Sequence, residues 1–334
     1  MVAHVIEGLG SGEYFSRVGV GIPPKPQYLI LDTGSDITWL QCEPCNNKCY
    51  NQTDPIFDPS SSTSFSQTPC GTQECNLLPD SACSNRTCRY QVSGDDGSYS
   101  IGELSKSGSS TTTRENIYIG CGHDNRGLSN SAAGLLALGR GSLSFPSQVN
   151  AYVFSYCLVD RDLGWSSTLQ FGSGAEPPDA ITAPLLGHPQ YPTFHYVGLT
   201  GISVGGRPLS LPQSVFDINP SSPSGVIVDT GTSATRLPTD PCLTFHLPLY
   251  DTCYDLSSET SISIPAIAFL LPDGKSWVLP ASNCLVPVDN RNKFCLAFAP
   301  TNSSVSIIGN LQQKGFRVSF NIVDSVIGFS PNRC

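Results

Sequence analysis

LILDTGS, at residues 29–35, is repeated in the second half of the chain as VIVDTGT at residues 226–232. In both copies, three apolar residues lead directly into Asp-Thr-Gly and then into a hydroxyl residue. Such an apolar run is typical of a buried strand, and the glycine allows a tight turn after it. Asp-Thr-Gly alone recurs by chance, but two copies after matched strands indicate an internal repeat. We therefore expect two related halves, each delivering one aspartate, Asp32 and Asp229.

The two aspartates have the chemistry of a peptide hydrolase that activates water. Two carboxylates held close together cannot both ionise easily, so they share a proton, and one acts as base while the other acts as acid. Water then attacks directly, and no nucleophilic Ser or Cys is needed. Around each carboxylate, the glycine would place an amide nearby, the hydroxyl would donate to an outer oxygen, and the threonine would help to lock the loops together. These supporting residues are Thr33, Gly34, Ser35, Thr230, Gly231 and Thr232.

Composition limits the other functions. The 334 residues are enough for two lobes or for one large unit. A net charge of −9 argues against nucleic acid or an anionic membrane surface as the main partner. No stretch reaches the roughly 20 apolar residues of a membrane span, the five histidines lack metal-ligand spacing, and no phosphate-loop motif is present. We expect no metal, no cofactor and a monomer.

Fourteen cysteines run from Cys42 to Cys334, and seven of them lie between Cys42 and Cys88. Buried free thiols are one interpretation, and a zinc site at the Cys42-x-x-Cys45 spacing is another, but no second ligand pair follows it. Disulfides fit such a number better and indicate an oxidising compartment. Sequons at Asn51, Asn85 and Asn302 agree with a secretory route.

The amino terminus does not look like a secretion signal. MVAHVIEGLGSGEYF has neither a basic region nor a long apolar region. The sequence leaves two interpretations open, a mature chain with an added Met1 or a truncated reading frame. The expected location remains the secretory pathway, either extracellular or in an endomembrane lumen.

Strand signatures dominate the chain, so we predict an all-β protein with few short helices. The apolar runs are β-branched or aromatic, and Gly, Pro, Asn and Ser separate them. One weak helix is expected from Ser142 towards Tyr152, interrupted by Pro146. FGSGAEPP, at residues 171–178, indicates a connection, so we place one lobe at 1–175 and the other at 176–334. The strands are expected at residues 27–31, 118–119, 194–199, 225–228 and 316–320.

Long stretches outside the two aspartate motifs match one protein family. DTGSDITWLQCEPCNNKCYNQTDPIFDPSSS, at residues 32–62, is similar to a cysteine-rich insert. GCGHDNRGL, SYCLVDRD, YVGLTGISVGG, DTCYDLSS, FCLAFAP and SIIGNLQQKG are equally specific. On these motifs, the chain resembles the pepsin-type aspartic proteases, the nepenthesin-like group of land plants, and within it the subgroup named after guard cells.

The resemblance implies a bilobal β fold that cleaves protein or peptide substrates in a cleft between the lobes, and synthesis as a secreted zymogen. It also implies a cysteine-rich insert at residues 42–88, a flap at about residues 90–104, and a disulfide between Cys253 and Cys295. The insert cysteines would then bond mostly among themselves, and Cys242 and Cys284 would form an extra bridge or stay free. The residues expected to form or support the flap and to face substrate are Trp39, Gly94, Asp95, Asp96, Gly97, Ser98 and Ser233.

The chain departs from the family pattern at four places. Gly94 stands where the family has a flap tyrosine, which predicts a mobile flap with Tyr90 and Tyr99 as poorly placed substitutes. Residues 103–110 are polar and predict a strand with little to bury. Ala137 replaces a glycine behind the first aspartate, and the segment at residues 236–251 is short. These departures keep a second hypothesis open, a weakly active or silent pepsin-fold protein that binds or inhibits a partner.

Overall fold

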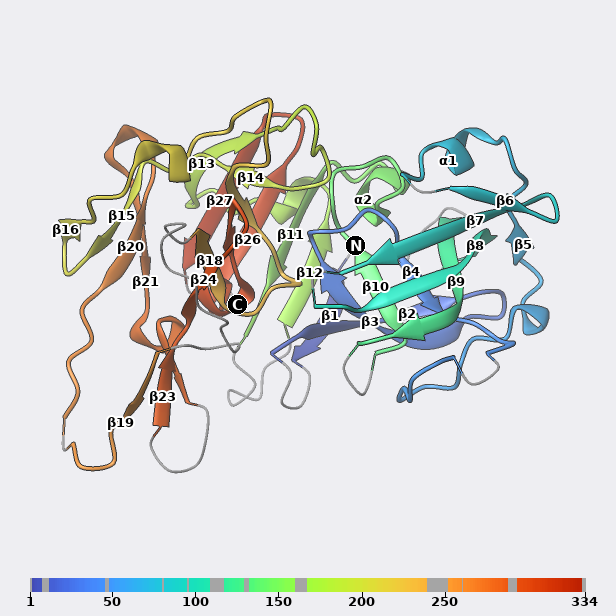
Figure 1. Cartoon of the computed structure of the whole chain (residues 1–334), viewed down its shortest axis with the longest axis horizontal. Coiled ribbons are helices and arrows are strands. Elements are labelled where there is room, and N and C mark those ends of the chain that lie inside the picture. Colours follow the sequence, from blue (N-terminus) through green and yellow to red (C-terminus); the bar gives the residue numbers. More distant parts are fainter. Residues whose placement is uncertain are drawn as a thin grey trace. The chain divides into compact units, whose positions relative to one another are not determined.

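The computed structural model describes residues 12–45, 48–79, 81–94, 96–108, 117–128, 132–159, 167–238, 252–259, 261–287 and 293–331, and the backbone of residues 2–7. The chain forms two compact units, Met1–Ala151 and Tyr152–Cys334. We predicted the lobe boundary after residue 175, whereas these units divide earlier because β11 (Val153–Cys157) pairs with β26 (Phe316–Asn321). Strands dominate both units, which confirms the predicted all-β class (Figure 1).

Unit 1 is built on one sheet whose strands run in the order β1-β2-β3-β10-β4-β9-β8-β7-β6. β5 pairs with β8 beside β7. The strands are β1 Val2–Glu7, β2 Tyr14–Val20, β3 Lys25–Asp32, β4 Trp39–Gln41, β5 Ser66–Gln67, β6 Ala82–Ser84, β7 Thr87–Ser93, β8 Tyr99–Ser107, β9 Ile117–Arg126 and β10 Gly134–Ala137. The helices are α1 Gln73–Asn76 and α2 Phe145–Gln148.

Unit 2 contains a larger sheet with the order β12-β11-β26-β27-β13-β14-β17-β25-β18-β24. Two small sheets, β16-β15-β20-β21 and β19-β23-β22, accompany it. The remaining strands are β12 Ser167–Phe171, β13 Ile181–Leu186, β14 Tyr196–Val197, β15 Gly201–Val204, β16 Arg207–Pro208, β17 Gly225–Val228, β18 Thr235–Pro238, β19 Cys253–Asp255, β20 Ile267–Leu270, β21 Ser276–Leu279, β22 Leu285–Pro287, β23 Lys293–Leu296, β24 Phe298–Thr301, β25 Val305–Ile308 and β27 Val326–Pro331. The helix α3 spans Asn310–Gln313.

The internal repeat predicted from the sequence is present as a repeated strand topology. In unit 1, β10 runs parallel to β3 and antiparallel to β4, and β4 runs parallel to β9. In unit 2, β25 stands in the same relation to β17 and β18, and β18 runs parallel to β24. The side chains of residues 29–31 and 226–228 are buried on both faces, which explains why both runs are continuously apolar rather than alternating.

The predicted helix at residues 142–152 is shorter than expected. α2 covers four residues, Ser144 caps its amino terminus, and Pro146 lies in the first turn, where a missing amide costs nothing. Asn150 adopts a left-handed conformation with φ of 55°, which prevents the helix from continuing. Among the described residues, no helix is both long and apolar enough to span a membrane.

The polar strand β8 is better packed than its sequence predicted. Our expectation of little burial was wrong for residues 103–107, because Glu103, Leu104, Ser105 and Ser107 are all buried between the neighbouring strands. Residues 109 and 110 lie outside the described ranges. The serine side chains are small, and Glu103 has hydrogen-bond partners, so a polar strand can lie under a covered face. The Ser105 hydroxyl is the exception, because it has no partner among the described residues.

The cysteines of the insert pair mostly among themselves. Six of the seven form the disulfides Cys45–Cys49, Cys70–Cys83 and Cys75–Cys88. The seventh, Cys42, leaves the insert to bond Cys121 on β9. In unit 2, Cys253 and Cys295 are joined across β19 and β23, while Cys284 is a buried free thiol and Cys242 lies outside the described residues.

A disulfide that closes a long loop and one that closes a short loop should stabilise the fold to different degrees. Cys42–Cys121 spans 79 residues and Cys45–Cys49 spans four. Because loop closure in the unfolded chain costs more entropy for longer loops, replacing both cysteines by serine should lower the free energy of unfolding by about 4.5 kcal/mol for the first pair and about 2 kcal/mol for the second. Urea unfolding of the two double variants checks the order. Equal losses would contradict it.

Candidate active site

The first Asp-Thr-Gly loop, residues 32–35, begins where β3 ends. Asp32 is opposite Ala137 in the parallel pairing of β3 with β10, and its carbonyl accepts the Leu138 amide at 2.7 Å. The Gly34 amide donates to Asp32 Oδ1 at 2.9 Å. Thr33 is buried, with 1% of its surface exposed. The strand therefore fixes the Asp32 backbone, and the turn supplies a donor to its carboxylate.

The second Asp-Thr-Gly loop, residues 229–232, repeats this arrangement after β17. The Gly231 amide donates to Asp229 Oδ1 at 3.1 Å, and the Thr232 hydroxyl donates to Oδ2 at 2.7 Å. The Asp229 amide donates to the Ile308 carbonyl of β25 at 3.0 Å. Both oxygens of Asp229 thus accept a hydrogen bond, which lowers the cost of holding this carboxylate at 8% exposure.

The strands behind the two loops also make matching contacts. The carbonyl of Ser35 accepts the Gly139 amide at 2.8 Å, and the carbonyl of Thr232 accepts the Asn310 amide at 2.7 Å. The hydroxyl of Thr38 in unit 1 accepts the Ala137 amide at 3.1 Å. In unit 2, the hydroxyl of Thr235 accepts the Gly309 amide at 3.2 Å. Each aspartate loop therefore rests on a similar hydrogen-bonded frame, in which the Asn310 contact lies one residue earlier, counted from its strand, than the Gly139 contact.

The hydroxyl residues of the two loops behave differently. Thr232 donates to its aspartate, as expected. The hydroxyl oxygen of Ser35 is buried and has no hydrogen-bond partner among the described residues. A buried hydroxyl without a partner is costly and needs an explanation. Ser233, expected to face substrate, follows the second loop and is partly exposed.

Two residues that sequence reasoning missed, Gln313 and Tyr156, support the second loop. Gln313 donates through Nε2 to the carbonyls of Asp229, at 3.1 Å, and Ile308, at 2.9 Å. Its Oε1 accepts the Tyr156 hydroxyl at 2.5 Å. Tyr156 is completely buried, and burial raises the pKa of its phenol well above the ordinary value. This hydroxyl therefore remains a donor to Gln313 at any working pH.

Gln312 performs a parallel task one residue earlier. Its Oε1 accepts the Thr235 amide at 3.1 Å and hydroxyl at 2.6 Å, and its Nε2 donates to the carbonyls of Asn283 and Ala297. Both glutamines are fully buried in α3. In the sequence, both glutamines lie within the family motif SIIGNLQQKG. No spacing rule gives a glutamine pair a role, so their function can be recognised only from the hydrogen-bond partners that the fold brings to them.

The flap strands lie over the core cluster that contains Trp39. Trp39, with 2% exposure, shares this cluster with Tyr90 of β7 and Leu104 of β8. The turn between β7 and β8 is closed by the Gly94 amide, which donates to the Ser98 carbonyl at 2.8 Å. Asp96 and Gly97, also expected in the flap, belong to this turn. Asp96 Oδ1 accepts the Ser98 amide, and Gly97 has a φ of 82°. Asp95 lies outside the described residues.

The two tyrosines considered as substitutes for the flap tyrosine have other partners. The Tyr90 hydroxyl is buried and lies 2.6 Å from Ser100 Oγ, which in turn donates to Asn125 Oδ1 at 2.7 Å. The Tyr99 hydroxyl donates to Asp124 Oδ1 at 3.1 Å. Both hydroxyls therefore tie the hairpin to β9.

One cluster of potential metal ligands exists among the described residues. Glu103, Cys121 and His123 place one ligand atom each within 4.8 Å of one another. Cys121 is already bonded to Cys42, so it has no thiolate to offer. The two remaining groups do not make a metal site by themselves.

Comparison with known proteins places this arrangement in a family. Two family models match, one described as Xylanase inhibitor N-terminal over residues 14–173 and one as Xylanase inhibitor C-terminal over residues 194–241 and 247–331. The chain is 43% identical to the protein named ASPARTIC PROTEASE IN GUARD CELL 2 of Arabidopsis thaliana, with 99% of this chain and 75% of that protein covered. It is 36% identical to aspartic proteinase nepenthesin-2 of Nepenthes gracilis, with 97% and 78% covered. The chain belongs to the nepenthesin-like, pepsin-type aspartic proteases. This result confirms the resemblance found in the sequence.

Solved structures show the same fold at low sequence identity. The chain matches basic 7S globulin from soybean with a TM-score of 0.72 and 17% identity, covering 98% of this chain and 94% of that one. It matches conglutin gamma from lupine seeds with a TM-score of 0.74 and 18% identity, covering 99% and 94%. At this identity the likeness concerns the fold alone.

The glycine behind the second loop predicts an asymmetric response to a methyl group. A Cβ added at Gly309 would overlap the backbone oxygen of Ser233, whereas the equivalent Ala137 already carries a buried methyl group. Because backbone cannot move aside easily, Gly309→Ala should lower the free energy of unfolding by about 1–3 kcal/mol. The matched variant Ala137→Gly should cost less, about 0.5–1 kcal/mol. Urea unfolding measures both, and a harmless Gly309→Ala would count against the repeated frame.

Proposed function

We propose that this chain is an aspartic endopeptidase in which Asp32 and Asp229 form the catalytic pair and cleave peptide bonds at acidic pH. The observation that carries the proposal is the repeated loop geometry, because each aspartate ends a buried strand and accepts an amide from the glycine two residues later. Family membership supports the same class of activity. Protein or peptide substrates are the expected partners.

The proposed reaction uses the pair as one acid and one base. The ionised carboxylate takes a proton from water as the water oxygen bonds to the peptide carbonyl carbon, and the protonated carboxyl gives its proton to the carbonyl oxygen. The carbon–nitrogen bond then breaks as the first carboxyl gives the proton it took from water to the leaving nitrogen, and the second carboxylate takes a proton back from a hydroxyl of the diol, which re-forms a carbonyl. The Gly34 and Gly231 amides and the Thr232 hydroxyl would hold the carboxylates in position during these transfers.

The competing function is a pepsin-fold protein that binds a partner without cleaving it. The matched family models are described as xylanase inhibitor, and the first unit carries Gly94 and Ala137 at positions where the family has tyrosine and glycine. The short segment at residues 236–251 belongs to the same argument, but residues 239–251 lie outside the described ranges. Retention of both aspartates and both following glycines favours the enzyme.

We further propose that the protein works in the secretory pathway or outside the cell. Its disulfides support this location, because disulfides form and persist mainly in oxidising compartments. The three sequon asparagines, Asn51, Asn85 and Asn302, are all exposed, so each is accessible to glycosylation. The expected monomeric state belongs to the same proposal.

The proposed pair predicts that either aspartate is indispensable. Asp32→Asn and Asp229→Asn should each lower kcat/KM by roughly 10²–10⁴-fold or more, because each removes one member of the acid and base pair. Cleavage of a denatured protein at acidic pH, with and without the hydroxyl-containing mimic pepstatin, measures the effect. Wild-type cleavage that pepstatin blocks favours the enzyme, whereas undiminished turnover in either variant overturns the assignment. A folded wild-type chain that cleaves nothing would favour the binding protein.

The missing flap tyrosine predicts a gain of function. Gly94→Tyr should raise kcat/KM by about 2- to 10-fold. A tyrosine ring in the flap that packs against another aromatic ring would stabilise the closed flap by about 0.5–1.5 kcal/mol. Peptide cleavage at acidic pH measures the change. The new Cβ would lie 2.7 Å from Asp96 Oδ1 and Ser98 Oγ, so both side chains must rotate.

Gly94→Ala is the matched control for that variant. It introduces the same Cβ and the same displacement of Asp96 and Ser98 but brings no ring. A gain confined to the tyrosine variant assigns the effect to the ring. Equal rates in the parent and both variants would show that the missing tyrosine does not limit turnover.

A further inference from the structure

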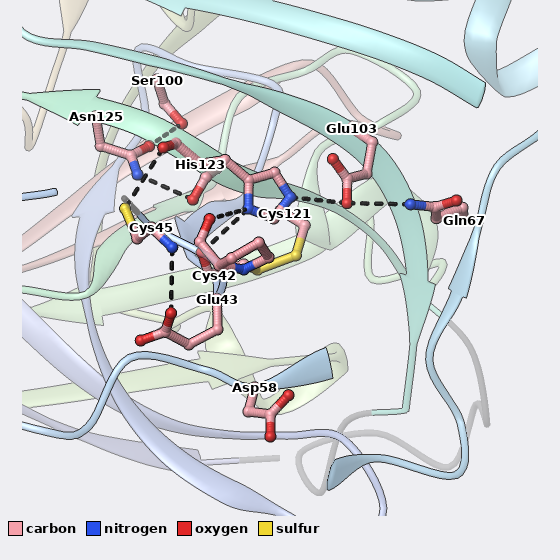
Figure 2. Close-up of a disulfide and its surroundings, with 12 residues drawn as sticks. Cys42, Glu43, Cys45, Asp58, Gln67, Ser100, Glu103, Cys121, His123 and Asn125 are labelled. Atoms are coloured by element: carbon pink, nitrogen blue, oxygen red, sulfur yellow. Dashed lines mark hydrogen bonds and ion pairs between the residues drawn. A yellow bond between two sulfur atoms is a disulfide. The ribbon is translucent and has the colours of Figure 1, made fainter. Parts of the chain in front are cut away.

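His123, on β9, is surrounded by hydrogen-bond acceptors. Its Nε2 lies 2.8 Å from Glu103 Oε1 on β8. Its Nδ1 lies 3.1 Å from the carbonyl oxygen of Cys42 and 3.1 Å from that of Pro44. Figure 2 shows the ring between these two sides, with the Cys42–Cys121 disulfide beside it. Both ring nitrogens can donate at once only when the imidazole is protonated.

His188 in unit 2 shows the opposite pattern. Its Nδ1 accepts the amides of Gln190 and Tyr191, and its Nε2 lies within 3.0 Å of the carbonyls of Asn219 and Ser222. One nitrogen accepts and the other donates, which suits the neutral ring. Burial of a histidine therefore does not by itself create the arrangement found at His123.

Glu103 needs a positive partner because it is buried. Its side chain is 8% exposed, and an unpaired buried carboxylate is costly. Gln67 of β5 donates to the same Oε1 at 3.3 Å, and Arg89 of β7 lies 3.9 Å from Oε2. At 3.9 Å the arginine provides charge but no hydrogen bond. His123 is therefore the closest charge partner of Glu103 among the described residues.

The other charged groups near His123 have partners of their own. Lys48 and Asp124 form an exposed ion pair at 2.6 Å, and Asp124 also accepts the Tyr99 hydroxyl. The carboxylate of Glu43 accepts the Cys45 amide at 3.1 Å. Asp58, on the insert side in Figure 2, accepts from Ser60. Of the charged side chains around His123 in the described part of the chain, Glu103 is the one that contacts the ring, so the charge of His123 depends chiefly on Glu103.

We propose that protonated His123 is a pH-dependent clamp that joins β8 of the flap hairpin to the chain at Cys42 and Pro44, where the cysteine-rich insert begins. In acid the clamp is closed, because the imidazolium donates to Glu103 on one side and to the two carbonyls on the other. When the ring loses its proton, only one of its nitrogens can still donate. Either Glu103 then keeps only Gln67 and the distant Arg89, or the carbonyls of Cys42 and Pro44 lose their donor. The clamp does not depend on the proposed catalytic activity.

The pKa shifts fix the pH range of the clamp. The hydrogen bond with Glu103, opposed by burial and aided by the Glu103 charge and the two carbonyls, raises the pKa of His123 above its ordinary 6.5. Burial opposes ionisation of Glu103, yet hydrogen bonds from His123 and Gln67 and the charges of His123 and Arg89 lower its pKa below 4.5. Stabilisation by His123 is complete below pH 6.5 and is lost as pH rises through the higher folded value; stabilisation by Glu103 is lost only as pH falls through its lowered value.

The direct test is the titration of His123 in the intact wild-type chain, followed by nuclear magnetic resonance of the imidazole. We expect its pKa above 6.5, and a decrease towards or below 6.5 in Glu103→Gln. A wild-type value at or below 6.5 overturns the clamp. This measurement needs no active enzyme, so its failure is distinct from a failure of the proposed function.

Amide hydrogen exchange tests the mechanical consequence. Relative to β26 in unit 2, and after correction for the intrinsic rate, protection of β8 should fall by about threefold or more between pH 5 and pH 8 in the wild type. His123→Gln should show no such fall, because glutamine keeps a donor but cannot titrate. Lys48→Gln is the control, since it removes a neighbouring exposed ion pair and should leave the fall intact.

Two outcomes of the exchange experiment contradict the proposal. One is a fall of the same size in His123→Gln, and the other is equal protection of β8 at both pH values in the wild type. If His123→Gln does not fold, the titration of the wild-type chain still decides.

Discussion

The structure depends on one constraint, that a carboxylate at the end of a buried strand needs hydrogen-bond donors close to it. Residues 29–31 and 226–228 are apolar and covered on both faces, and each run leads directly into an aspartate, of which Asp229 is buried and Asp32 is partly buried. The carboxylate then needs donors from its own loop, and the glycine amide two residues later supplies one in both units. The parallel neighbour strand holds the loop from behind through backbone hydrogen bonds. The rest of each unit supports this arrangement.

The two units differ in how completely hydrogen bonds satisfy the aspartate loop. In unit 2, Thr232 completes the carboxylate, and the buried pair Gln312 and Gln313 satisfies the surrounding backbone. In unit 1, the Ser35 hydroxyl has no partner among the described residues, and Ala137 takes the place of a glycine. In unit 1, buried polar interactions occur instead around the flap hairpin. The Tyr90 hydroxyl contacts Ser100, and His123 contacts Glu103 in the proposed clamp. The disulfide Cys75–Cys88 links β7 of this hairpin to the insert, and Cys42–Cys121 links the insert to β9.

Local patterns predicted what depends on local chemistry. The apolar runs before Asp32 and Asp229 identified their strands and the repeat, and long family motifs identified the fold. Polar strand β8 was misjudged because alternation counts apolar side chains, while its serines and Glu103 are accommodated by neighbours far away in sequence. The roles of Gln313 and Tyr156 were invisible for the same reason, since 157 residues separate them. The pairing of Cys42 with Cys121 likewise follows from β4 lying beside β9.

In the proposed mechanism the two aspartates act as one unit, and inhibitor binding is the decisive test of that pairing. Pepstatin presents a hydroxyl where the attacking water would stand, so it requires both carboxyls and their shared proton. Titration calorimetry at acidic pH should give one site per wild-type chain and strongly weakened binding in Asp32→Asn and in Asp229→Asn alike. Undiminished binding in either variant, or no binding by a folded wild-type chain, would overturn the proposed catalytic pair.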